Sequence, residues 1–131
     1  MSILYKRIKE FNLLELKELF LSVGWNSGNY PEKLQISLKN LHSVFSAWDE
    51  EKLVGLISCL SDGIITVYLN NLLVKPEYQG NGIGTKLVNM VIEEYKNYEK
   101  KLLIAENTAV GFYAKLGFRE GNDVTPMRLQ K

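Results

Sequence analysis

The chain has 131 residues, 46% of them hydrophobic and 24% charged, and a formal net charge of +1. That length and composition predict one globular domain over residues 1–131 with a core of its own, and the balanced charge argues against nucleic acid or an anionic membrane surface as a partner. No apolar stretch reaches the ~20 residues of a membrane span, and charged residues interrupt the N-terminus where a signal peptide is apolar, so we expect a cytoplasmic protein.

The first third of the chain predicts a strand followed by two helices. Residues 3–8 alternate loosely between apolar and polar side chains, as a strand does. Residues 13–23 carry apolar side chains at helical spacing, and Gly24 ends that helix. After a loop, Pro31 opens a second helix at its favoured first position, running to about residue 41.

The middle of the chain predicts a three-stranded meander. Residues 43–48 and 53–60 are apolar runs joined by a polar turn, and residues 64–74 form a long third strand. Cys59 lies in the second run and is expected to be a small buried side chain. As the single cysteine it excludes an intramolecular disulfide.

The last third predicts two helices among short strands. Residues 83–95 form an amphipathic helix, residues 102–105 a buried strand, and residues 108–117 a helix capped by Thr108. Two short strands, residues 118–120 and 127–129, complete the order β-α-α-β-β-β-α-β-α-β-β. We therefore expect an α/β fold, with a mixed, mostly antiparallel sheet of six or seven strands and helices on both faces.

A glycine-rich stretch between the third strand and the amphipathic helix indicates a phosphate site. Such a loop exposes backbone N–H groups at the positive end of a helix dipole, and its glycines allow a ligand to approach the backbone. The candidate cofactor-binding residues here are Gln79, Gly80, Asn81, Gly82, Ile83, Gly84 and Thr85.

Three phosphate-loop patterns compete for this stretch, beside a purely structural turn. A dinucleotide fingerprint would need glycine where Thr85 stands, and the Walker spacing does not occur. The spacing Q-x-x-G-x-G fits Gln79, Gly82 and Gly84. With that spacing the chain resembles the GNAT superfamily of N-acetyltransferases. The resemblance implies that the loop binds the pyrophosphate of acetyl-coenzyme A.

A second motif, N-T-A-V-G-F-Y-A-K-L-G-F over residues 107–118, strengthens the resemblance, which extends over the order of elements from residue 3 to residue 129. It implies that Tyr113 lies near the thioester sulfur, where a phenol can protonate the departing thiolate. Asn107 is implied to contact the cofactor arm, with helix capping as its alternative. Phe112 is a cofactor contact or simply core.

The end of the third strand is the expected place for the pantetheine arm. In the family this strand parts from its neighbour, often at a bulge, and the resemblance implies that the backbone of Leu73 and Val74 pairs with the pantetheine amides. Many members carry a glutamate on this strand as general base, but the matching positions here are Tyr68 and Asn70. Water held by Tyr68, Asn70 or Asn71, or else Glu106, would have to serve instead.

The acceptor pocket of the family is usually built by the first two helices and their loop, where Trp25 and Tyr30 stand out. Both are predicted to line the pocket by cation–π or stacking contacts, or else to form a lid on the sheet. The prediction is an acetyl-CoA-dependent N-acetyltransferase without a metal, acting on a small-molecule or peptide amine, with a homodimer as one open oligomeric state. A catalytically silent acyl-CoA sensor is the alternative, and a nucleotide-binding domain is a weaker one.

Overall fold

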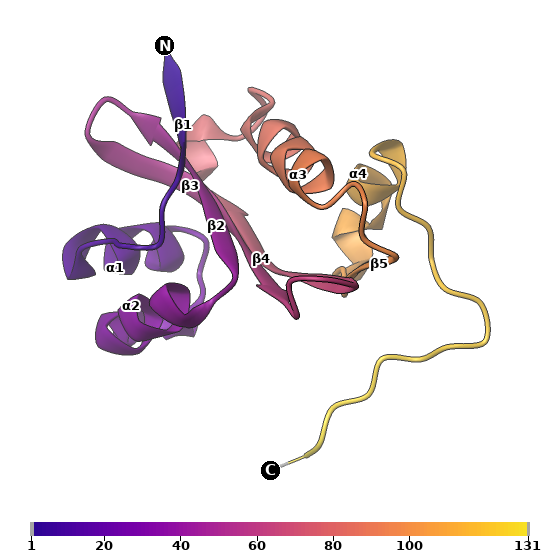
Figure 1. The fold of residues 1–131 in the computed structure, drawn as a ribbon. Helices are drawn as coiled ribbons and strands as arrows, with labels where there is room; N and C mark the ends of the chain where they lie inside the picture. The colour runs from indigo at the N-terminus through magenta and orange to yellow at the C-terminus, as the bar shows by residue number, and fades with distance from the viewer. Residues whose placement is uncertain (1, 131) are drawn as a thin grey trace.

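A computed structural model describes residues 2–130 of the chain. Its regular elements follow one another as two layers of helices around a single sheet (Figure 1). In chain order they are β1 (Ile3–Arg7), α1 (Leu13–Ser22), α2 (Pro31–Asn40), β2 (Ser43–Asp49), β3 (Lys52–Ser61), β4 (Thr66–Val74), α3 (Ile83–Glu94), β5 (Lys100–Leu103) and α4 (Val110–Lys115), with 3-10 turns at Asn26–Asn29, Pro76–Tyr78 and Asn107–Ala109.

The five strands lie in the order β1-β2-β3-β4-β5. The first four pair antiparallel with their neighbours, and β4 pairs with β5 in parallel. The expectation of a mixed, mostly antiparallel sheet is therefore confirmed. The parallel pair is connected through α3, because two parallel neighbours need a long crossover.

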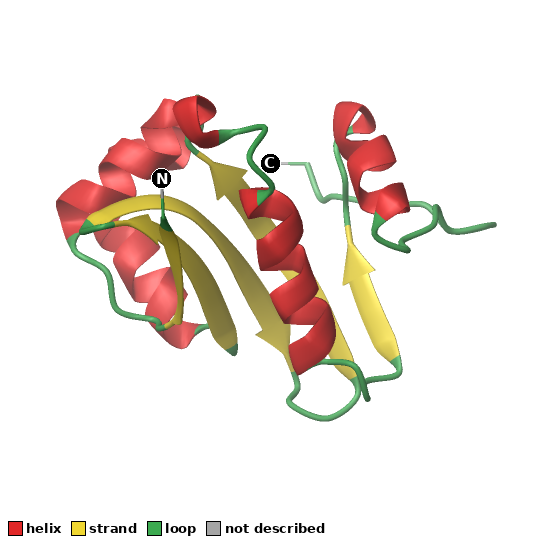
Figure 2. Cartoon of the chain, turned by 90° about the horizontal axis from the view of Figure 1, so that it is seen from above, coloured by secondary structure: helices red, strands yellow, loops and turns green. Residues whose placement is uncertain are grey.

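The core has two parts, one on each face of the sheet. Alternate side chains of β2 and β3 serve the two sides, as the period of a strand requires. Phe45 and Ile57 pack with α3, whereas Val44 and Leu56 pack with α1 and α2. Helices therefore cover both faces, as expected (Figure 2).

The predicted number of strands was wrong. The sheet has five strands, and residues 118–120 and 127–129 are described without any strand. A strand needs a neighbour to satisfy its backbone, and this segment lies against none. Its own residues also interrupt an extended path, since Asp123 has a positive φ of 59° and Pro126 lacks an N–H.

Two smaller expectations concern the meander. β4 begins at Thr66 rather than at residue 64, because Asp62 turns the chain by accepting backbone N–H groups of the next residues. Cys59 is fully buried, as expected, and burial raises the pKa of its thiol to about 11.

Of residues 2–130, no helix is both long and apolar enough to span a bilayer.

Candidate active site

The loop that follows β4 is held together by its own side chains. The Gln79 amide donates to the Val74 carbonyl at 2.9 Å, and the Asn81 amide donates to the Tyr78 carbonyl at 3.1 Å. Tyr78 is buried, and its hydroxyl donates to Asp49 at 2.5 Å, which ties the loop to the β2–β3 turn. The polar side chains thus fix the shape of the loop, and among the described residues the backbone N–H groups of residues 80–82 have no acceptor.

Two glycines allow this loop to turn directly into α3. Gly80 and Gly82 have φ angles of 82° and 81°, in the left-handed region where a Cβ is disfavoured. Nothing lies within 4 Å of a Cβ built on either, so the requirement for glycine is conformational rather than steric.

The N-terminus of α3 carries no protein cap. Gly82 occupies the capping position without a side-chain hydrogen bond, and no acidic residue lies in the first turn. The first helical N–H to find an acceptor within the helix is that of Lys86, which donates to the Gly82 carbonyl. The N–H groups of Ile83, Gly84 and Thr85 come before it and have no acceptor in the helix, which is what an anionic ligand requires.

The strands β4 and β5 part beside this helix end. Their pairing runs only from Thr66–Lys100 to Leu69–Leu103, whereas β4 continues to Val74 (Figure 2). The register to β3 also shifts at this point, since Ser58 pairs with Asn71 and its neighbour pairs with Leu69. One β4 residue, Asn70, is therefore bulged out. The parting begins after Leu69 and the bulge falls at Asn70, upstream of Leu73 and Val74, for which the family resemblance implied them.

The parting leaves residues 70–74 of β4 paired only with β3 on one side, within the part of the chain that the structure describes. An extended amide ligand can add to such an edge. The Val74 carbonyl, however, already accepts from Gln79. The Lys75 N–H donates to the Val54 carbonyl, so by the alternation of an antiparallel ladder the backbone groups of Leu73 point toward β3 and those of Val74 point toward the open edge. Of the two expected residues, Val74 therefore faces this edge, and its carbonyl becomes available only if Gln79 moves.

The structure brings α4 next to the glycine loop. The Phe112 ring lies against the first turn of α3, since a Cβ built on Gly84 would be 3.5 Å from its Cζ. Tyr113 is half-buried, with its ring centroid 5.0 Å from that of Phe112 and 5.8 Å from that of Phe118. Burial raises the pKa of the Tyr113 hydroxyl, which keeps it protonated at neutral pH. Among residues 2–130 this hydroxyl has no hydrogen-bond partner, so it is available to a ligand.

The two residues expected to cap the last helix do not do so. Thr108 lies inside a 3-10 turn, and α4 begins after Ala109 with no side-chain cap. Asn107 is exposed and also makes no capping hydrogen bond. The helix predicted over residues 108–117 is instead this turn plus a shorter α4, because no side chain satisfies its first N–H groups. The alternative of Asn107 as a helix cap is therefore wrong.

The candidate acceptor residues lie on the α1–α2 side of the sheet. Trp25 is half-buried and packs edge-on against Phe20 of α1, with ring centroids 5.9 Å apart. Tyr30 is 52% exposed, with the Lys33 ammonium 5.2 Å above its ring. Tyr68 of β4 pairs with Leu60 of β3, and both side chains face the α1–α2 side of the sheet. Trp25 thus packs against α1 and the core on this face of the sheet.

One polar side chain near the bulge escaped the sequence analysis. The Ser58 hydroxyl is buried and has no hydrogen-bond partner among the described residues. Its strand register pairs it with Asn71 of β4 and Val44 of β2, which sets it on the α1–α2 face. Buried hydroxyls without a partner are rare in proteins and often bind water. The signal was a serine within the apolar run of residues 53–60.

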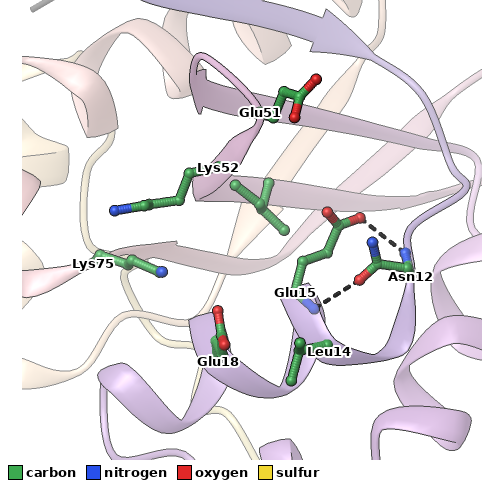
Figure 3. A pocket seen from close by; sticks show the side chains of 8 residues that line it. Asn12, Leu14, Glu15, Glu18, Glu51, Lys52 and Lys75 are labelled. Atoms are coloured by element: carbon green, nitrogen blue, oxygen red, sulfur yellow. Dashed lines mark hydrogen bonds between the residues drawn. The ribbon is translucent and has the colours of Figure 1, made fainter.

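Two surface cavities lie away from these residues. One, of about 560 Å³, is lined by α3 residues together with Lys96 and Phe45. The other, of about 330 Å³, lies at the start of α1 between the β2–β3 turn and the end of β4 (Figure 3). Its lining includes the acidic side chains of Glu18 and Glu51 and the basic side chains of Lys52 and Lys75. Asn12 and Glu15 also line it and are joined by the two hydrogen bonds that cap α1. No predicted site residue lines either cavity.

Residues 24–128 match the acetyltransferase (GNAT) domain family. The chain belongs to the GNAT acetyltransferase family. It is thus an N-acetyltransferase by family, and membership implies acetyl-CoA as the acetyl donor. The glycine loop, the uncapped α3 and the parted strands are the elements of this chain that fit such a donor.

Known relatives agree with this assignment. An uncharacterized N-acetyltransferase, ycf52, of Pyropia yezoensis is 33% identical over 88% of this chain and 69% of its own length. A GNAT family acetyltransferase of Streptococcus pneumoniae TIGR4 has a structure with a TM-score of 0.87, 30% identity, and coverage of 99% of this chain and 98% of its own. This chain spans about two thirds of the curated relatives that it matches first, 69% and 66% of their lengths.

A third similarity concerns the fold alone. An aminoglycoside acetyltransferase from an uncultured soil metagenomic sample, in complex with sisomicin, has a TM-score of 0.75 and 23% identity, with coverage of 98% of this chain and 96% of its own. As to metals, residues 2–130 contain no group of three or more His, Cys, Asp or Glu side chains that could hold an ion.

Proposed function

We propose that this GNAT enzyme transfers the acetyl group of acetyl-CoA directly to the amine of a small-molecule acceptor while both are bound. The observation that carries the proposal is the parting of β4 and β5 beside the uncapped start of α3. It combines an open strand edge for the pantetheine amides with free N–H groups for the pyrophosphate. The proposal also includes the amine of a peptide as acceptor, since it would reach the same site between β4 and β5.

In the transfer, the acceptor nitrogen attacks the thioester carbonyl, a C–N bond forms, and the C–S bond breaks. Backbone N–H groups of β4 past the bulge stabilise the oxygen that gains negative charge. The Tyr113 hydroxyl protonates the departing thiolate and later regains a proton from water. Its raised pKa supports this role, because the hydroxyl stays protonated through the neutral range.

The acceptor amine must lose a proton, and β4 carries no carboxylate to take it. We propose a water held between the Ser58 hydroxyl and the polar β4 side chains Tyr68 and Asn70 as the relay. Ser58 supports this because it is buried without a partner beside the bulge. Glu106 follows the C-terminal end of β5, and its full exposure to solvent makes it the weaker candidate.

Calorimetric titration of the whole chain with acetyl-CoA tests the donor site, with ATP and NAD as controls. We expect micromolar affinity, about −8 kcal/mol, and no response to the controls. A folded sample that binds no acetyl-CoA would overturn the proposal. An amine screen with thiol detection then tests the transfer.

The missing β4 carboxylate favours one second candidate, a catalytically silent acyl-CoA-binding module. It predicts the same acetyl-CoA affinity but no thiol release with any amine. The protonated, unpartnered Tyr113 hydroxyl argues against it, since a module that only binds has no use for a proton donor there.

A further inference from the structure

Three large side chains form one row across β3, β4 and β5. Tyr68 of β4 pairs with Leu60 of β3 on one side and with Leu102 of β5 on the other. Paired residues of neighbouring strands carry their side chains on the same face, about 5 Å apart, so the row is continuous. It lies on the α1–α2 face, because Leu60 is four residues beyond Leu56, which packs with α1 and α2.

No helix covers this row within residues 2–130. The core on the α1–α2 face takes its strand residues from β2, β3 and the end of β4, and it contains none of the three side chains. In Figure 1, α1 and α2 lie beside β2, whereas β5 lies at the other end of the sheet. Leu60 is 45% exposed, Leu102 is 51% exposed, and Tyr68 is half-buried. Adjacent apolar side chains left uncovered in this way usually mark a binding surface.

The row begins beside the residues proposed for the transfer. Tyr68 precedes the bulged residue Asn70 by two positions. Ser58 and Asn71, which pair with each other next to the bulge, lie on the same face as the row. Two residues of a strand span about 7 Å, so the substituent of an amine held at the bulge reaches the row.

The elements around this site carry no acidic residue. β4, β5 and residues 107–118 contain neither Asp nor Glu. The Asp62 carboxylate, just beyond β3, already accepts three backbone N–H groups of its own turn. Glu106 is exposed in the loop after β5, where solvent and salt screen its charge. Lys100, two residues before Leu102 on β5, instead adds a positive charge to the face of the row.

We propose that the acceptor is an amine with a single amino group and a large apolar substituent, and that Leu60, Tyr68 and Leu102 bind this substituent. The inference rests on the proposed acetyl transfer and narrows its acceptor to apolar monoamines. Polyamines and other polycations are poor acceptors, because a second ammonium would lose water against the two leucines without gaining a counter-charge. Leu102 thus determines specificity without touching the reacting atoms.

Two amines of equal length provide the first test. Hexylamine ends in a methyl group, whereas hexamethylenediamine ends in a second ammonium. When each is titrated calorimetrically into the whole chain saturated with coenzyme A, hexylamine should bind at least about tenfold more tightly. Its kcat/KM in the thiol-release assay with acetyl-CoA should exceed that of the diamine by a similar factor. Equal or tighter binding of the diamine overturns the inference.

Chain length gives a second reading with the same protein. Propylamine is three methylenes shorter than hexylamine, and each methylene that is buried is worth up to about fourfold in affinity. Propylamine should therefore bind at least about tenfold more weakly than hexylamine. Equal affinities would show that no apolar surface receives the substituent, which overturns the inference.

A charge placed in the row should reverse the preference. Leu102→Glu should weaken hexylamine binding about tenfold or more and tighten diamine binding, with acetyl-CoA affinity changed less than about twofold. Ile36→Glu, which adds the same charge at an exposed position on α2, is the matched control and should change none of these affinities. Leu102→Ala, a milder second variant, should weaken hexylamine binding about threefold, and circular dichroism verifies that all three variants fold. A ratio of amine affinities that is unchanged in Leu102→Glu contradicts the inference.

Binding and turnover separate this inference from the proposed function. A chain that binds hexylamine and acetyl-CoA but releases no thiol supports the apolar site and refutes the acetyl transfer. A chain that acetylates the diamine faster than hexylamine keeps the proposed function and refutes the apolar acceptor. If neither amine binds, the inference is overturned whatever other amines are acetylated.

Discussion

The starts of α1 and α3 are built in opposite ways. α1 begins with a complete capping box, in which the Asn12 side chain accepts the Glu15 N–H and the Glu15 carboxylate accepts the Asn12 N–H, both at 2.8 Å. α3 begins at Gly82, which has no side chain to offer. A cap of the first kind is worth about 1 kcal/mol, so α3 forgoes stability that one residue could supply.

At α1 a side chain satisfies the first helix N–H groups, whereas α2, α3 and α4 all begin without a side-chain cap. One turn outside the helices also supplies a side-chain acceptor. Backbone N–H groups of Ile64, Ile65 and Thr66 all donate to the Asp62 carboxylate, at 2.8–3.1 Å. At α3 the same kind of donor is left for an anion that the protein does not carry, which fits the pyrophosphate of the donor.

The largest effect is expected at the reacting end of that donor. Tyr113→Phe should lower kcat on the order of 100-fold through loss of the proton donor, with acetyl-CoA affinity changed less than about twofold. Steady-state kinetics and calorimetry measure the two quantities. Tyr5→Phe, on the distant β1, is the matched control, and a fall in kcat of less than about threefold for Tyr113→Phe would refute the acid role.

The next effect separates ligand binding from stability at α3. Thr85→Glu puts a negative charge in the first turn, which should stabilise the helix by about 0.3–1 kcal/mol but repel the pyrophosphate. We expect a higher Tm and an acetyl-CoA Kd raised about tenfold or more.

Asn89→Glu, which adds the same charge one turn later, is the control for Thr85→Glu and should change neither quantity much. If Thr85→Glu leaves the Kd unchanged, α3 does not hold the phosphate.

The converse change is made at α1. Asn12→Ala removes the cap and should lower the free energy of unfolding by about 1 kcal/mol, within a range of 0.5–2 kcal/mol. Acetyl-CoA affinity should not change, because this helix end faces no donor. Chemical denaturation and calorimetry measure both, and a loss of affinity would show that the two starts are not independent.

The smallest effect concerns Asp62, whose pKa is lowered by the three backbone N–H donors. A carboxylate with a lowered folded-state pKa stabilises the fold above its unfolded pKa of about 3.9, and this stability is lost as the pH falls through the folded-state pKa. Asp62→Asn should therefore be less stable than wild type at pH 6 and equal to it at pH 2. Denaturation curves at the two pH values test this, and an equal difference at both would contradict it.

Local patterns in the sequence were sufficient for most of the fold. The apolar spacing of residues 83–95 predicted α3, and Pro31 marked the first residue of α2, because both signals act within a few residues. The site residues are still predictions, but the glycine loop and the Tyr113 helix do lie together, with Phe112 against Gly84.

The sequence by itself determined the family, the order of helices and strands along the chain from β1 to α4, and the position of the glycine loop, since these follow from local spacing and left-handed glycines. Tertiary structure alone decided what depends on a neighbour. It set the bulge at Asn70, the unpartnered hydroxyl of Ser58, and the fate of residues 127–129. A strand, a bulge or a buried hydroxyl is defined by what lies beside it, and a short run of residues does not contain that information.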